Sequence, residues 1–143
     1  MRKDSWLEIE ELLAEFNELG INKAVDYDKY YLYSLITHST AIEGSTLTEV
    51  ETQLLFDEGI TANGKPLVYH LMNVDLMQAY EYVIEEAKQH KPITPLFLQR
   101  LSGMVMRTTG SVHSAMGGTF DSSKRGYRLC GVTAGVGGRS YMN

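Results

Sequence analysis

The residue types that carry most enzyme chemistry are present in this chain, but they are scattered along it. The four histidines are His38, His70, His90 and His113. No two of them are four residues apart, as in a helical metal-binding pair, and no His-Glu-x-x-His motif is present, so no zinc site is predicted. The single cysteine, Cys130, has no second cysteine with which to form an internal disulfide. The glycine cluster at 135–138 lacks the Lys-Ser/Thr pair of a phosphate-binding loop, which favours a hairpin tip. We therefore expect no catalytic residues and no metal ligands within this chain.

One segment has a more specific pattern, the run Ser39–Val50. Ser39 and Glu43 are four residues apart, so in a helix they share one face near its C-terminal end. A carboxylate there meets the negative end of the helix dipole, which is unfavourable unless a cation compensates it. Taken alone, the pattern favours a solvated Glu43 near a helix end and an ordinary helix-surface Ser39.

This segment resembles the autoinhibitory helix of the Fic family, the protein adenylyltransferases that transfer AMP from ATP to a hydroxyl of a target protein. The family pattern is Ser/Thr-x-x-x-Glu-Gly/Asn, and Ser39, Glu43 and Gly44 match it. The resemblance extends over residues 30–143 through further segments similar to the family core: Lys65-Pro66-Leu67, Asn73, Ala79, Tyr80, and Lys91-Pro92-Ile93-Thr94.

The resemblance implies roles for several residues of the intact enzyme. Ser39, Glu43 and Gly44 would compete with ATP, because Glu43 would hold the arginine that otherwise binds the γ-phosphate. Leu129, Cys130, Gly131 and Val132 would form a flap that docks the target's backbone. The family signature His-Pro-Phe-x-x-Gly-Asn-Gly-Arg, with its general base and phosphate-binding glycines, is absent from the sequence. ATP and Mg²⁺ are thus expected for the intact enzyme, and this chain alone is expected to be inactive and to hold no cofactor.

The elements that must position these residues are mainly helical. Apolar periodicity and end signals predict helices over 5–19, 27–41, 46–58, 67–90 and 94–109. Capping boxes are predicted at Ser5–Glu8 and Thr46–Glu49, and Thr94 is predicted to cap the fifth helix with Pro95 at its first position. Gly20 and Gly59 are predicted to end the first and third helices. Residues 117–126 are predicted to be a loop, and 127–132 to pair with 140–142 in a small β-hairpin. The expected fold is thus a Fic-like helical bundle fragment, with residues 1–64 as an N-terminal helical region and 65–143 as the start of a catalytic core.

Two of these helices are expected to be buried widely. The crowding of Tyr30, Leu32, Tyr33, Leu35 and Ile36 predicts burial on more than one side of the second helix. The long fourth helix is expected to turn its apolar positions inward: Leu71, Val74, Met77, Ala79, Tyr82, Val83 and Ala87.

Composition narrows the class of protein. The 143 residues carry a net charge of −5, with 17 acidic and 5 basic side chains in residues 1–86, against 1 and 8 in the remainder. No stretch is long and apolar enough for a membrane span, no signal peptide is visible, and the basic tail has too few aromatic residues for a nucleic-acid platform. A cytoplasmic protein that binds neither membrane nor nucleic acid is expected, with exposed apolar surface at a truncated core promoting homo-oligomers.

Two other classes of function stay open from the sequence. The chain could be an antitoxin-like binding module that supplies the inhibitory helix to a separate Fic enzyme. It could also be a helical interaction domain without enzymology.

Overall fold

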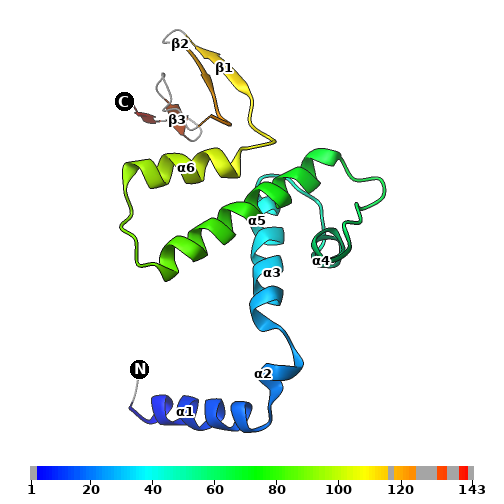
Figure 1. The fold of residues 1–143 in the computed structure, drawn as a ribbon, viewed down its shortest axis with the longest axis vertical. Helices are drawn as coiled ribbons and strands as arrows, with labels where there is room; N and C mark the ends of the chain where they lie inside the picture. Colours follow the sequence, from blue (N-terminus) through cyan, green and yellow to red (C-terminus); the bar gives the residue numbers. More distant parts are fainter. Residues whose placement is uncertain (1–2, 116–117, 125–131, 135–138, 142–143) are drawn as a thin grey trace. The chain divides into compact units, whose positions relative to one another are not determined.

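The computed structural model describes residues 3–115, 118–124, 132–134 and 139–141, and within them the chain is mainly helical (Figure 1). The elements in chain order are α1 (Lys3–Glu18), α2 (Ile21–Ala24), α3 (Tyr27–Ile42), α4 (Glu49–Glu58), α5 (Leu67–Lys88), α6 (Pro95–Val105), β1 (Val112–Ala115), β2 (Gly118–Asp121), β3 (Val132–Ala134) and β4 (Arg139–Tyr141). The predicted mainly α fold with a small hairpin near the C-terminus is confirmed. The chain divides into two compact units, residues 1–35 and 36–143. No helix in the described ranges has the length and apolarity that crossing a bilayer requires.

The first unit contains α1, α2 and the beginning of α3. Gly20 separates α1 from α2 in the left-handed conformation, with φ at 67°, as its position after the apolar stripe predicts. The predicted Ser5–Glu8 capping box is wrong, because α1 already begins at Lys3 and Ser5 lies within its first turn. The unit is too short to cover its own apolar surface, and most large apolar side chains of α1 are exposed: Trp6, Leu7, Ile9, Leu12 and Leu13.

Helix α3 begins where the sequence predicts, and Asp26 caps it by accepting a hydrogen bond from the Lys29 backbone N–H at 3.0 Å. Burial on several sides was expected, but it is wrong for Tyr30 and Leu35, which are 54% and 47% exposed. Tyr30 has an edge-on contact with the neighbouring Tyr31, with ring centroids 5.6 Å apart, instead of a second layer of apolar side chains.

The second unit continues with α4, whose capping box lies two residues later than predicted. Thr48 accepts from the Glu51 backbone N–H, and Glu51 in turn accepts from the Thr48 N–H, so the box is Thr48–Glu51. Thr46 is not free to cap, because both its carbonyl and its hydroxyl oxygen accept from Lys65 Nζ. Gly59 ends the helix in the left-handed conformation.

Helices α5 and α6 pack against each other. Tyr82 and Phe97 stack with ring centroids 5.7 Å apart, and the Thr94 cap with Pro95 at the first helical position is confirmed. The expected inward face of α5 is only partly correct: Ala79 is buried, but Ala87 is exposed, and the other buried positions are polar residues, namely His70, Asn73 and Asp75. Helix α6 ends at Val105 rather than near residue 109.

Two antiparallel hairpins follow α6. In the first, β1 pairs with β2 from Val112↔Asp121 to Ala115↔Gly118, so the prediction of a loop over 117–126 is wrong for the residues of β2. Cross-strand stacking of His113 on Phe120, at 5.0 Å between centroids, accounts for this pairing. In the second, Val132 pairs with Tyr141, which confirms the predicted hairpin at this end of the chain. The rest of its predicted first strand, 127–131, lies outside the described residues.

Candidate functional site

Ser39 and Glu43 line one pocket of about 530 Å³ in the second unit. The end of α3 contributes both of them together with Thr40. The opposite walls are apolar side chains of α5 and residues at and beyond the end of α6: Val68, Met72, Leu76, Val105, Met106 and Thr109. We call this cavity the Glu43 pocket. Its volume is in the range of small-molecule and cofactor sites. Among the residues that the structure describes, nine line this pocket, and none of these nine is basic.

The end of α3 has the hydrogen bonds of a Schellman motif, which fixes where Glu43 lies. The Ser45 N–H donates to the Thr40 carbonyl at 3.0 Å, and the Gly44 N–H donates to the Ala41 carbonyl at 3.0 Å. Gly44 has φ at 96°, a left-handed conformation that a side chain would strain. The glycine of the Glu-Gly pair therefore has a backbone role in ending the helix immediately after Glu43.

The electrostatic setting of Glu43 is unfavourable for an isolated carboxylate. It is exposed, it follows the last residue of α3, and it meets the partial negative charge of the helix C-terminus. In the part of the chain that the structure describes, no Lys or Arg forms an ion pair with it. Ser39 is half-buried one turn earlier on the same face. This arrangement can attract a cation into the pocket mouth.

A buried polar network holds the end of α3 against α4 and α5. Asn73 donates to the Thr40 hydroxyl at 3.2 Å and to the Tyr69 carbonyl at 2.8 Å. Its amide oxygen accepts from the Thr52 hydroxyl at 3.3 Å, and Thr37 donates to Thr52 at 2.9 Å. Asn73 and Thr52 have no exposed surface, so these bonds satisfy polar groups that cannot reach water. Since Thr40 lines the Glu43 pocket, the network positions one of its walls.

The opposite wall is fixed by Asp75, another fully buried residue of α5. Its Oδ2 atom accepts from the Thr108 backbone N–H at 2.7 Å and from the Thr108 hydroxyl at 2.9 Å. These bonds draw the segment after Val105 out of the helix, which explains the early end of α6. They also position Met106 and Thr109, both of which line the pocket.

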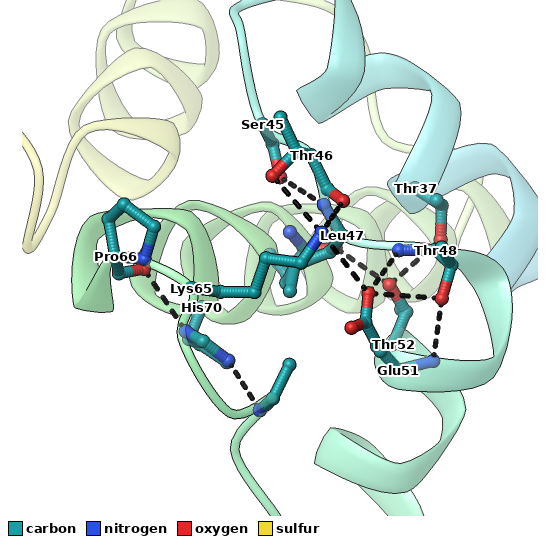
Figure 2. A network of polar contacts seen from close by, with 12 residues as sticks. Thr37, Ser45, Thr46, Leu47, Thr48, Glu51, Thr52, Lys65, Pro66 and His70 are labelled. Atoms are coloured by element: carbon teal, nitrogen blue, oxygen red, sulfur yellow. Dashed lines mark hydrogen bonds and ion pairs between the residues drawn. The ribbon is translucent and has the colours of Figure 1, made fainter.

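The connection between α3 and α4 is tied to the loop before α5, as Figure 2 shows. Lys65 Nζ lies 2.6 Å from the Thr46 carbonyl oxygen and 3.8 Å from Glu51 Oε2. The Thr48 backbone N–H, at 2.8 Å from Glu51, lowers the pKa of that carboxyl, and the Lys65 charge lowers it further. Lys65 and Glu51 thereby hold the segment between Gly44 and α4, through Thr46 and Thr48 respectively.

His70 closes the loop before α5 and is only 3% exposed. Its Nε2 atom accepts from the Ala62 N–H at 2.8 Å, so the proton of the neutral ring is on Nδ1, 3.2 Å from the Pro66 carbonyl (Figure 2). Both ring nitrogens are thus engaged in shaping the loop. This histidine thus holds the loop in shape, and the residues described around it form no group of metal ligands.

The remaining predicted site residues are not brought to this pocket by the described part of the chain. Of the expected docking segment, Leu129, Cys130 and Gly131 lie outside the described residues, and Val132 is the first residue of β3. Within the described ranges, no three His, Cys, Asp or Glu side chains are grouped as metal ligands.

The buried residues that build the site, Thr37, Thr52 and Asp75, were not identified as functional from the sequence. The sequence did contain a signal, because these polar residues interrupt helical stripes that are otherwise apolar. Polar residues at such positions are also typical of helix faces exposed to solvent, so the signal did not distinguish the two cases. No protein-family model matches the chain, and searches of curated proteins and of solved structures found no match.

Proposed function

We propose that this chain is the N-terminal part of a Fic-type protein adenylyltransferase, and that Glu43 inhibits it. The observation that carries the proposal is the Glu43 pocket, where Ser39 and Glu43 of the resembling motif line one cavity and none of the described lining residues is basic. A guanidinium from the segment that bears the family signature would find an exposed carboxylate and the negative end of α3 there.

In the intact enzyme, the target hydroxyl oxygen would attack the α-phosphorus of ATP. The bond between the α-phosphorus and the bridging oxygen would break, pyrophosphate would leave with Mg²⁺, and the hydroxyl proton would pass to the histidine of the signature. This chain supplies none of those groups. The proposed role of this chain is to hold Glu43 where its carboxylate would compete with the γ-phosphate of ATP for the same arginine.

The proposal predicts a gain of activity when the carboxylate is removed. The protein would be expressed with the sequence that follows Asn143 in its gene, and incorporation of labelled AMP from ATP and Mg²⁺ into the protein itself would be measured. Glu43→Gln should raise labelling by about tenfold or more, because losing an arginine–carboxylate pair frees the guanidinium for the nucleotide.

A matched control is available in the same unit. Glu58 is the last residue of α4, is exposed, and precedes Gly59, which has φ at 69°. It therefore repeats the local geometry of Glu43 away from the pocket, and Glu58→Gln should leave labelling unchanged. Equal labelling in wild type and Glu43→Gln contradicts the inhibitory role. A downstream sequence without the signature contradicts the assignment of this chain to the enzyme itself and favours inhibition in trans.

A further inference from the structure

We propose that α1 is a self-association surface, through which two copies of this chain pair their first helices antiparallel. The inference concerns the first unit alone and is independent of AMP transfer. It rests on a row of exposed apolar side chains along α1 (blue in Figure 1). We call this row the α1 stripe. Its exposed members are Trp6, Ile9, Leu12 and Leu13, with Leu19 just beyond the end of α1. Phe16 lies on the same face but is half-buried, with its ring centroid 5.9 Å from that of Tyr27.

The spacing of the α1 stripe is that of a coiled-coil seam. Trp6, Ile9, Leu13 and Phe16 follow one another at intervals of three, four and three residues. Leu12 and Leu19 widen the seam on one side. The stripe ends at Gly20, where the chain turns in the left-handed conformation. It thus forms a straight apolar face about two heptads long.

The exposed area is sufficient for a weak specific contact. Trp6, Ile9 and Leu13 are 56%, 48% and 56% exposed, while Leu12 and Leu19 are 60% and 66% exposed. Side chains of this size at such exposure leave on the order of 100 Å² each, so a pair of stripes buries about 1,000 Å², near the lower limit for a specific interface.

The charges of α1 favour a second copy over other occupants. Glu11, Glu15 and Glu18 project from the side of the helix opposite the stripe, so they neither repel a second copy nor attract a basic peptide to the seam. An acidic face is also unfavourable at an anionic lipid surface, where interfacial helices carry Lys and Arg. The apolar face is self-complementary about a twofold axis, with Glu10 as an acidic residue at its edge.

An antiparallel pairing about residue 11 stacks the side chains in matched layers. Ile9 lies opposite Leu13 of the second copy, so an aliphatic side chain meets an aliphatic one, and Trp6 lies opposite Phe16, which is half-buried beside Tyr27 of its own chain. In this orientation the positive end of each helix dipole lies beside the negative end of the other, which is favourable. Glu10 of each copy comes close to Glu10 of the other, which weakens the dimer.

Sedimentation equilibrium of the 143-residue chain at about 1 to 100 µM tests the proposed dimer. A dimer with a micromolar dissociation constant would change from mostly monomer to mostly dimer over this range. The mean mass should rise with concentration from 16.1 kDa toward twice that value. The emission of Trp6, the single tryptophan, should move to shorter wavelength in parallel. Leu13→Lys should keep the chain monomeric at all these concentrations. Leu7→Lys is the matched control, because Leu7 is 59% exposed on the side of α1 away from the stripe, and it should dimerise as the wild type does.

Removing the repulsion tests the orientation. Glu10→Gln should tighten the dimer by roughly threefold or more, whereas Glu11→Gln should leave it unchanged. A wild-type chain that remains monomeric at 100 µM overturns the proposal. This holds at any emission wavelength of Trp6, because the proposal requires a second copy. Equal loss of dimer in Leu7→Lys and Leu13→Lys overturns the assignment to the stripe, and no effect of Glu10→Gln overturns the antiparallel register. Far-UV circular dichroism verifies that each variant keeps its helix content.

Discussion

Replacing Asn73 with alanine should destabilise the second unit strongly, although the residue touches no solvent. Its side chain makes three hydrogen bonds, to the Thr40 hydroxyl, the Thr52 hydroxyl and the Tyr69 carbonyl, at 3.2, 3.3 and 2.8 Å. Each contributes roughly 1 kcal/mol net, and the buried partners left without a bond add a desolvation cost. We therefore expect Asn73→Ala to lower the free energy of unfolding by about 3 kcal/mol.

The assay is urea denaturation followed by circular dichroism at 222 nm. With a slope of roughly 1.5 kcal/mol per molar urea for a domain of this size, the midpoint should fall by about 2 M. Gln53→Ala is the control, because Gln53 is an exposed amide next to Thr52 on α4 and should shift the midpoint little. A shift below about 0.5 M for Asn73→Ala would refute the claim that this network holds the end of α3 in place.

A double-mutant cycle isolates the bond between Asn73 and Thr52. Thr52→Val removes the hydroxyl that donates to Asn73 and accepts from Thr37 while keeping the side-chain shape. The double variant should lose less stability than the two single losses added together, by about 1 kcal/mol. Strict additivity would mean that the two side chains act independently.

Two further predictions concern the ends of elements. The pKa of Glu51 is lowered by the Thr48 N–H, so the ionised carboxylate stabilises the fold above the ordinary glutamate pKa of 4.5, and this contribution is lost as the pH falls through the lowered value. Wild type should thus exceed Glu51→Gln in stability at pH 7 and converge with it in acid, and parallel pH profiles in urea denaturation would contradict this. Gly110→Ala should cost about 1–3 kcal/mol, because an added Cβ would lie 2.5 Å from the Met106 carbonyl oxygen and 2.7 Å from the Ser123 N. Gly59→Ala is the control, because the space there is open and the variant should cost only the strain of its positive φ. If Gly110→Ala is as stable as Gly59→Ala in urea denaturation, the close approach at Gly110 is contradicted.

Local signals predicted the helices well because their ends depend on nearby residues. Thr94 with Pro95, and the glycines at 20 and 59, act within a few residues of themselves, and the structure has them where the pattern indicates. The Thr46 capping box failed because a distant lysine, Lys65, takes the oxygen atoms of Thr46. Local spacing contains no information about such a tertiary contact.

The candidate site could be predicted only in part, for the same reason. The spacing of Ser39 and Glu43 places them on one face of a helix, but the pocket they line is completed by α5 and the end of α6. That arrangement depends on Asn73 and Asp75, whose partners are 33 residues away from them in sequence at Thr40 and Thr108. The burial of polar rather than apolar residues on α5 follows from these pairings, which no periodicity in the sequence indicates.

The most direct test of the proposed competition at the Glu43 pocket is to compare the binding of ATP and ADP to the intact protein by isothermal titration calorimetry. If Glu43 and the γ-phosphate compete for one guanidinium, Glu43→Gln should tighten ATP by about tenfold and leave ADP nearly unchanged. Unchanged affinity for ATP, or an equal gain for both nucleotides, would contradict the account.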